Sequence, residues 1–275
     1  MAKLLSYEEK GTWIHRLSGI TKLIFFLIWC ALSALTYDTR ILLVMILISL
    51  IAFACSRTKW KQVGSVFRVI MIFMVLNLAA IYIMAPEQGC AIYGTRKVLF
   101  HIAGRYFMTR EQLFYMFNVM IKYFTVIPAV FIFLVTTNPS ELAASMNRVG
   151  VPYTISYALS IALRYIPDVQ GDFHRIRNAQ EARGIEMSAK ARLGERIRRT
   201  ASIIFPLLFS SMERIEVVSN AMELRSFGKN KKRTWYAMKP LGRNDRLVLI
   251  GTVLFFIAGI VITYADGSRF WAYWL

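Results

Sequence analysis

The sequence has few of the residues that build metal centres, disulfides or catalytic clusters. Its 275 residues include three cysteines and three histidines, all widely spaced. Cys30 and Cys55 lie in apolar runs, which argues against a disulfide framework. Because no His or Cys spacing matches a metal-ligand or redox motif, the sequence predicts neither a metal site nor a cofactor.

Acidic residues are scarce as well, and their placement disfavours further classes of protein. The chain has 34 Lys and Arg against 16 Asp and Glu, which gives a net charge of +18. None of these acids falls inside a long apolar run, so an intramembrane enzyme built on paired carboxylates is disfavoured. The sequence also has no Gly-rich loop ending in Gly-Lys-Ser/Thr, so no nucleotide-binding P-loop is predicted.

Apolar residues are abundant, at 56% of the chain, and they gather in long blocks. Blocks of this length predict membrane spans, and so an all-α integral membrane protein with about five transmembrane helices. Residues 1–136 are expected to form a bundle of four spans, and residues 247–275 to contain the last one. The five blocks are Leu23–Leu35, Ile41–Cys55, Val69–Ala85, Leu113–Val135 and Leu247–Tyr264.

The connections between the blocks differ in charge. Residues 137–246, between the fourth and fifth spans, hold 19 of the basic residues against 10 of the acids. The positive-inside rule therefore predicts that this segment and the N-terminus are cytoplasmic and that the C-terminus is external. Residues 86–112 form a long polar connection that is mildly basic, and its side of the membrane stays open.

Three polar residues interrupt the predicted spans. Asn77 lies in the third span, and Asn118 and Lys122 lie in the fourth. A lysine at membrane depth costs about 2.5–3.5 kcal/mol on insertion scales, so its side chain usually faces protein or water. We interpret Lys122 as paired inside the bundle, with Asn77 as one candidate partner. A role in a substrate site is the alternative.

The segment 137–246 opens with a strong helix-start signal. Asn138 is expected to be the N-cap, Pro139 the first helical residue and Glu141 the third, which together make a capping box. This short helix is predicted to end near Gly150. A second, longer helix is predicted to start at Pro152.

One short motif occurs twice in this segment. Ala-Gln-Glu-Ala-Arg-Gly-Ile surrounds Arg183, and Ala-Met-Glu-Leu-Arg-Ser-Phe surrounds Arg225, 42 positions later. Gly184 and Gly228 follow the two arginines, where a helix end needs a residue that tolerates positive φ. A single arginine in a last turn can simply bond free carbonyls at the negative end of the helix dipole. Two matched copies in a basic region of a membrane protein instead favour paired docking points.

Each motif ends a helix of similar design. The first helix has an apolar part at residues 155–166, then Pro167 and a charged part. The second has an apolar part at residues 203–209 around Pro206 and then a charged part. The basic segment between the two helices, from Lys190 to Arg199, is predicted to be a linker.

The basicity of the chain has two competing explanations. Residues 229–236, basic and then aromatic, are expected to bind anionic lipid headgroups, and residues 270–274 to form an interfacial aromatic belt. Nucleic-acid binding would need basic residues in one stripe with stacking aromatics. Because acids interrupt the basic residues, no nucleic-acid partner is predicted (Glu181, Glu186, Glu195, Glu213, Glu216 and Glu223).

These segments resemble a known family, the transmembrane T component of energy-coupling factor transporters, the EcfT/CbiQ family. The resemblance covers roughly a third of the chain and is highly specific, whereas the membrane spans match only in number and placement. It is carried by Thr136–Leu142, Gly150–Pro152, Arg164–Pro167, Ala179–Gly184, Pro206–Leu208, Ser210–Ser211 and Ala221–Gly228.

The resemblance implies a scaffold in a bacterial or archaeal cell membrane, with no chemistry of its own. Residues 137–246 would form a cytoplasmic coupling domain of two long helices and a short connecting helix. Each arginine motif would dock on one of two ABC-type ATPase subunits. A separate S component, which captures a vitamin or a metal ion, would pack on the apolar faces of the two helices. The implied ATPase-binding residues are Ala182, Arg183, Gly184, Leu224, Arg225 and Ser226, and the implied S-component contacts are Leu159, Leu163, Leu207 and Leu208.

The second motif departs from the Ala-Arg-Gly pattern that is common in the family. Ser226 keeps a small residue after the arginine, whereas Leu224 adds bulk before it, which is expected to distinguish one ATPase from the other. A conventional ABC transporter permease with its own substrate pathway is the alternative function. Such a permease subunit would bring one docking element, whereas this chain carries two.

Overall fold

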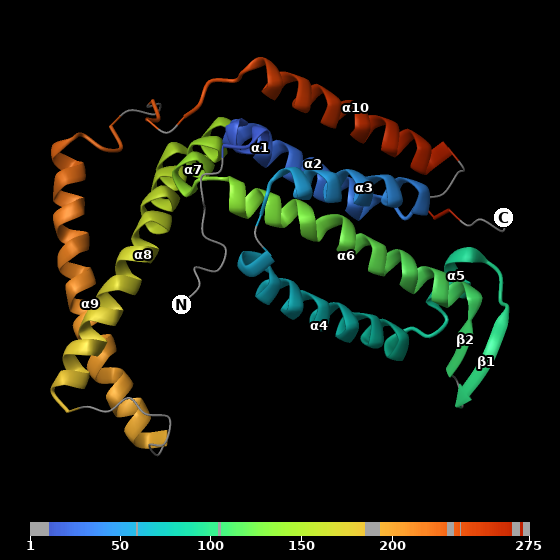
Figure 1. Ribbon diagram of the computed structural model, residues 1–275, viewed down its shortest axis with the longest axis horizontal. Helices are drawn as coiled ribbons and strands as arrows, with labels where there is room; N and C mark the ends of the chain where they lie inside the picture. Colours follow the sequence, from blue (N-terminus) through green and yellow to red (C-terminus); the bar gives the residue numbers. More distant parts are fainter. Residues whose placement is uncertain are drawn as a thin grey trace. The chain divides into compact units, whose positions relative to one another are not determined.

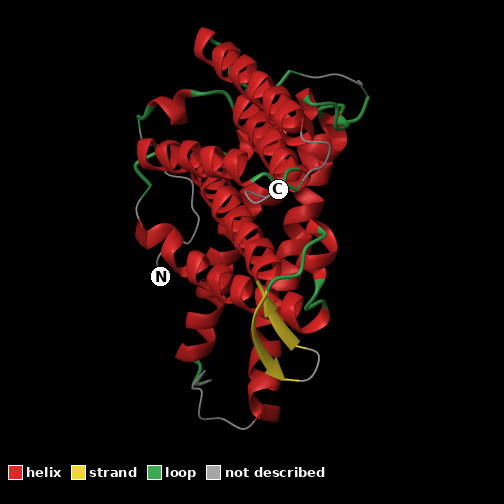
Figure 2. Ribbon diagram, turned by 90° about the vertical axis from the view of Figure 1, so that its right-hand side faces the viewer, coloured by secondary structure: helices red, strands yellow, loops and turns green. Residues whose placement is uncertain are grey.

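The computed structural model describes residues 11–58, 60–103, 106–184, 193–229, 234–236, 238–265 and 270–271. In this part of the chain the fold is helical apart from one short hairpin (Figure 2). The chain divides into two compact units. Unit 1 comprises residues 1–141 and 238–275, and unit 2 comprises residues 142–237.

Unit 1 is a bundle of long helices (Figure 1). The helix α6 (Arg110–Thr136) contacts α2 (Gly19–Leu35), α3 (Thr39–Cys55) and α4 (Trp60–Met84), while α10 (Arg243–Ala265) packs on α2. A short helix, α1 (Trp13–Arg16), precedes α2. All five predicted spans are therefore helices, and the predicted all-α membrane fold is confirmed, whereas the assignment of four spans to residues 1–136 stays a prediction.

The five apolar helices differ in length. Val63–Met84, α6 and α10 are long and apolar enough to cross a membrane. The helices α2 and α3 are apolar but have 17 residues each. At about 1.5 Å per residue, such a helix is roughly 25 Å long, near the lower limit for a span.

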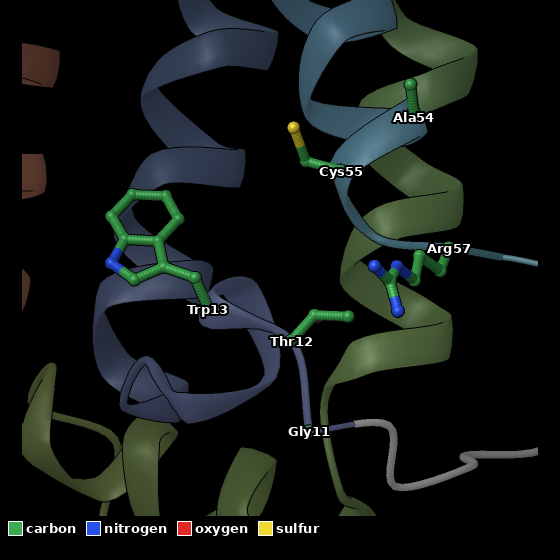
Figure 3. Close-up of a pocket in the computed structure, with 6 residues that line it drawn as sticks. All are labelled: Gly11, Thr12, Trp13, Ala54, Cys55 and Arg57. Carbon is green, nitrogen blue, oxygen red and sulfur yellow. The ribbon is translucent and has the colours of Figure 1, made fainter.

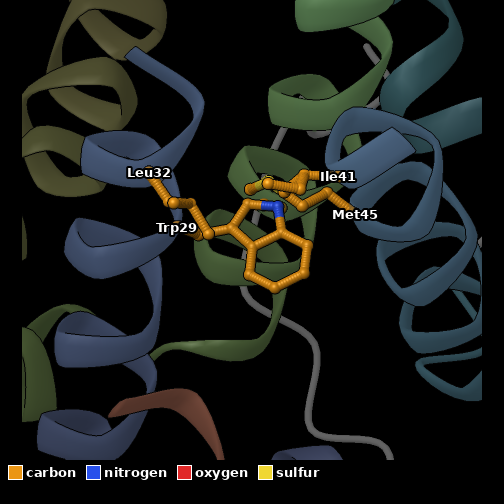
Figure 4. Close-up of a cluster of buried hydrophobic side chains, with 5 residues drawn as sticks. Trp29, Leu32, Ile41 and Met45 are labelled. Carbon is orange, nitrogen blue, oxygen red and sulfur yellow. The ribbon is translucent and has the colours of Figure 1, made fainter. Parts of the chain in front are cut away.

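The core of unit 1 lies where α2, α3 and α6 meet. Trp29, Leu32, Ile41 and Met45 are almost fully buried there (Figure 4). The indole N–H of Trp29 donates to the Thr125 carbonyl oxygen at 3.3 Å, so the one polar atom of this ring is satisfied. Aromatic and aliphatic side chains of α10 close the cluster from the other side of α2 (Phe255, Phe256 and Ile260).

The polar connection 86–112 is more ordered than the sequence predicted. It contains α5 (Gln88–Tyr93) and an antiparallel hairpin of β1 (Val98–Ala103) and β2 (Tyr106–Thr109). The pairing changes register twice along these strands, so no clean alternation of apolar and polar residues marks them in the sequence.

Lys122 is paired inside the bundle, as predicted, but Asn77 is not among the partners seen for it. Its ammonium donates to the Ala34 carbonyl oxygen at 3.3 Å and lies 3.2 Å from the centre of the Tyr37 ring. Asn118 accepts a hydrogen bond from the Thr39 hydroxyl at 2.7 Å. The polar residues of the fourth span thus bond to α2, α3 and the turn between them.

Unit 2 is built on two long helices that contact each other, α8 (Tyr153–Ala182) and α9 (Leu193–Leu224). The preceding helix α7 (Pro139–Arg148) begins as predicted. The side-chain oxygen of Asn138 accepts a hydrogen bond from the Ser140 N–H at 3.0 Å. After α7, Gly150 has a φ of +115°, which matches the predicted helix end.

The predicted basic linker is wrong in part. Helix α9 begins at Leu193, so Arg196, Arg198 and Arg199 belong to it, whereas Lys190 and Arg192 lie outside the described residues. Arginine is a good helix former, so a basic run can be helical as readily as extended. The predicted assignment of 137–246 to a cytoplasmic coupling domain stays a prediction.

Candidate functional site: two arginine motifs at helix ends

The first motif is the C-terminal end of α8. The Arg183 N–H donates to the Ala179 carbonyl oxygen at 3.3 Å, and the Gly184 N–H donates to the Glu181 carbonyl oxygen at 3.0 Å. Gly184 has a φ of +83°, the left-handed conformation that glycine adopts without steric cost. Arg183 is thus the residue immediately before the left-handed turn that ends the helix.

The second motif ends α9 with the same pattern. The Ser226 N–H donates to the Glu223 carbonyl oxygen at 2.8 Å, and the Phe227 N–H donates to the Met222 carbonyl oxygen at 2.9 Å, which is a Schellman motif. Ser226 has a φ of +54° and takes the role that the sequence assigned to Gly228, although Gly228 also has a positive φ. Arg225 therefore occupies the same position in its helix end as Arg183 does.

Both motifs are accessible to a partner. All six implied ATPase-binding residues are exposed, and Leu224 is 88% exposed. A leucine with so large an exposed fraction at a helix end offers apolar surface that a partner protein can bury. The ends of α8 and α9 lie apart within unit 2 (Figure 1).

An aromatic cluster holds the second motif to the start of α8. The Phe227 ring lies 4.8 Å from that of Tyr157 and 5.8 Å from that of Tyr153, between centroids. The Trp235 ring joins the cluster 5.3 Å from Tyr153, and its indole N–H donates to the Asn147 side-chain oxygen at 3.1 Å. The indole of Trp235 thus packs on protein, whereas residues 230–233 lie outside the described residues, so lipid-headgroup binding by residues 229–236 stays a prediction.

An ion-pair cluster joins α8 to α9. The Asp172 carboxylate on α8 accepts hydrogen bonds from Arg175 and, at 2.7 Å, from Arg214 on α9. The hydrogen bond from Arg175 and the charge of Arg214 lower the pKa of Asp172 despite some desolvation. The Gln180 side chain adds a hydrogen bond to the Ser202 carbonyl oxygen at 3.2 Å. Sequence reasoning missed the Asp172–Arg214 pair because its partners lie on different helices.

The two helices also expose a large apolar surface. Of the implied S-component contacts, Leu159, Leu163 and Leu207 are half-buried, and Leu208 is 52% exposed. Large apolar residues of the same two helices are more than two-fifths exposed, and exposed apolar side chains in such number are typical of surfaces that bind a partner or lipid. They are Ile155, Ile166, Ile204, Phe205, Phe209, Met212, Ile215 and Val217.

Unit 1 has a cavity of about 650 Å³ between the segment before α1 and the end of α3 (Figure 3). Arg57 is the only charged side chain among the described residues that line it, and it points into the space opposite Trp13. No group of three potential metal ligands occurs in the described part of the chain. The arginine motifs therefore remain the stronger candidate site.

Comparison with known proteins agrees with the sequence resemblance. The sequence model of the CbiQ family, described as cobalt transport protein, matches residues 10–236. A protein of Exiguobacterium sibiricum, named energy-coupling factor transporter transmembrane protein EcfT, is 26% identical over 94% of this chain and 96% of its own length. Proteins with the same name from Leuconostoc gelidum subsp. gasicomitatum and Bacillus selenitireducens are each 27% identical, over 94% and 95% of this chain and 96% and 97% of their own lengths.

Proposed function

The chain belongs to the CbiQ family, and on that premise we propose that it is the transmembrane scaffold and coupling subunit of an energy-coupling factor importer. In this function it transmits the ATP-driven motion of two ABC-type ATPase subunits to a substrate-binding S component. The importer takes up a vitamin or a metal ion. The N-terminus is cytoplasmic, and lipids surround the apolar helices of unit 1.

The observation that carries this proposal is the equivalence of the two helix ends. Arg183 and Arg225 each stand one residue before a left-handed turn, so both guanidinium groups start from the same backbone geometry. Guanidinium recognises a carboxylate through two parallel hydrogen bonds. Two equal tips suit two ATPases of similar structure, and this favours a scaffold over a permease that brings one docking element per subunit.

The apolar surface of α8 and α9 supports the second half of the proposal. Leu208 and the exposed apolar residues near it on α9 are unfavourable in contact with water. Burial by a small, apolar membrane protein such as an S component would stabilise them. The helix pair then has partners at its tips and along its length. Motion of the tips reaches the apolar surface because the Asp172–Arg214 pair ties α8 to α9.

Native mass spectrometry of the chain co-expressed with its ATPases tests this proposal. We expect two ATPase subunits for each copy of the chain. Arg148→Ala is the matched control for Arg183→Ala and Arg225→Ala and should still bind both ATPases. Arg148 is also an exposed arginine at the end of a helix, but it belongs to neither copy of the motif. A complex with a single ATPase per chain would contradict the proposal that each arginine motif docks one ATPase.

A further inference from the structure

The chain crosses between the two units twice, and an ion pair within unit 1 links the two crossing points. It leaves unit 1 after Glu141 and returns to it at Met238. The ammonium nitrogen of Lys239 lies 3.4 Å from Oε2 of Glu141. The last residue before the exit and the second residue after the return are thus in contact, although they are 98 positions apart.

The same carboxylate also fixes both connections to the beginning of α2. Its other oxygen, Oε1, accepts a hydrogen bond from the Gly19 N–H at 2.8 Å. Gly19 is the first residue of α2, where backbone N–H groups have no partner within the helix and attract negative charge. Glu141 is only 4% exposed, so water competes little for its bond to Gly19, whereas the Lys239 side chain is 44% exposed and its ion pair meets water on that side.

The surroundings of this carboxylate are held by further charged groups in unit 1. The Lys22 ammonium donates to the carbonyl oxygen of Thr136, the last residue of α6, at 2.8 Å. The Asp245 carboxylate, in the first turn of α10, accepts hydrogen bonds from the Ser18 N–H and the Gly242 N–H, both at 2.8 Å. Each charge thus meets a helix end of opposite dipole sign, and the ends of α2, α6 and α10 are fixed to one another.

Helix capping alone does not explain Glu141. The sequence predicted a glutamate that closes a capping box at the start of α7. In the structure, Asn138 caps that helix, while the Glu141 carboxylate bonds to Gly19 and Lys239, which belong to two other segments. A residue that served only α7 would need neither partner and would not have to be buried.

We propose that Glu141 is a positioning residue for transport: it fixes both chain connections of unit 2 to the start of α2. Displacement of unit 2 is then delivered to the membrane bundle at one point and is not absorbed by two independent connections. The inference rests on the proposed function, in which unit 2 receives its motion from the ATPases. Loss of the Glu141 contacts uncouples ATP hydrolysis from uptake.

The test uses the full complex in proteoliposomes and measures the ratio of substrate uptake to ATP hydrolysis. Glu141→Gln keeps the size of the side chain and removes its charge, and Lys239→Met removes the partner. We expect each variant to assemble and hydrolyse ATP as the wild type does, while the ratio falls about tenfold, as a coupling of this kind allows. Arg243→Met, which removes an exposed cation at the start of α10, is the control and should leave the ratio unchanged.

The double variant distinguishes positioning from a general loss of stability. Because Glu141 and Lys239 act as one contact, Glu141→Gln with Lys239→Met should lower the ratio no further than either change alone. Losses that add, or uptake that falls only in proportion to the amount of assembled complex, would overturn the proposal. An unchanged ratio in Glu141→Gln would overturn it as well.

A measurement on the isolated chain separates this inference from the proposed function. In Glu141→Ala, hydrogen exchange should become about tenfold faster in residues 18–20 and in residues 238–242 together, because one side chain protects both. Faster exchange in one segment alone would refute the shared contact. Failure of the wild-type chain to bind ATPases would instead refute the proposed function, whatever the exchange result.

Discussion

The two arginine motifs have the same backbone pattern but are held in different ways. At the end of α8, Gly184 takes the left-handed conformation without strain. At the end of α9, Ser226 takes it against a steric cost of about 1 kcal/mol, and the next residue, Phe227, is packed among aromatic rings. The comparison shows that local hydrogen bonds present the arginine, whereas tertiary packing decides how firmly its helix end is fixed.

The largest expected effect comes from removing either arginine. In Arg183→Ala or Arg225→Ala, a partner carboxylate would be left buried and unpaired, which costs about 2–5 kcal/mol, or roughly 30-fold to several thousand-fold in affinity. Lysine at either position should rescue only part of this loss because it lacks the planar fork. Affinity measurements with purified ATPases check the effect, and a change below twofold would mean that the arginine only caps its own helix.

A smaller and one-sided effect is expected from Phe227→Ala. Aromatic pairs contribute about 0.5–1.5 kcal/mol each, so the second helix end should lose much of its anchorage while the first is unaffected. Photo-cross-linkers at positions 224 and 182 report ATPase contact at each end separately. Cross-linking should fall at position 224 only. Phe173→Ala, which truncates a half-buried phenylalanine of α8 outside the cluster, should change neither.

Exchanging the turn residues tests the strain directly. Ser226→Gly should raise the free energy of unfolding, and Gly184→Ser should lower it, each by at most about 1 kcal/mol. Ser219→Gly is the control: at an exposed position inside the C-terminal part of α9, a glycine should destabilise by about 0.5–1 kcal/mol. Thermal unfolding in detergent gives the order, and destabilisation by Ser226→Gly would show that the serine is not strained.

The smallest effect concerns the pH dependence of the tie between α8 and α9. Because the pKa of Asp172 is lowered in the folded chain, its stabilising contribution is present above the unfolded value of about 3.9 and is lost as the pH falls through the folded value. The difference in Tm between wild type and Asp172→Asn should therefore stay constant from pH 8 to 5, and it should shrink below about pH 4. A difference that already shrinks near pH 6 would contradict the lowered pKa.

Features set by neighbours in the sequence could be predicted, and features set by distant contacts could not. The start of α7 at Pro139 and the left-handed turn at Gly184 follow from capping residues and glycine. The paired hairpin strands, the packing of Trp235 and the partners of Lys122 depend on contacts across the fold. Glu141 shows both cases, since the sequence places it correctly in the first turn of α7 but gives no sign of Gly19 or Lys239.

The same distinction applies to the candidate site. Repetition of the motif identified both arginines, because the repeat is local and needs no knowledge of the fold. The aromatic cluster around Phe227 and the Asp172–Arg214 pair were missed, because their members come from separate helices. What the sequence predicted was therefore the contact points, and what it left out was the way those points are connected.

The most direct test of the account is the double variant Arg183→Ala with Arg225→Ala, expressed with both ATPases. Each arginine is exposed at a helix end, so the variant should fold and insert as the wild type does. We predict that it no longer copurifies with the ATPases and supports no uptake, while the Arg148→Ala control does both. Copurification and uptake at wild-type levels would contradict the claim that the two arginines are the docking points.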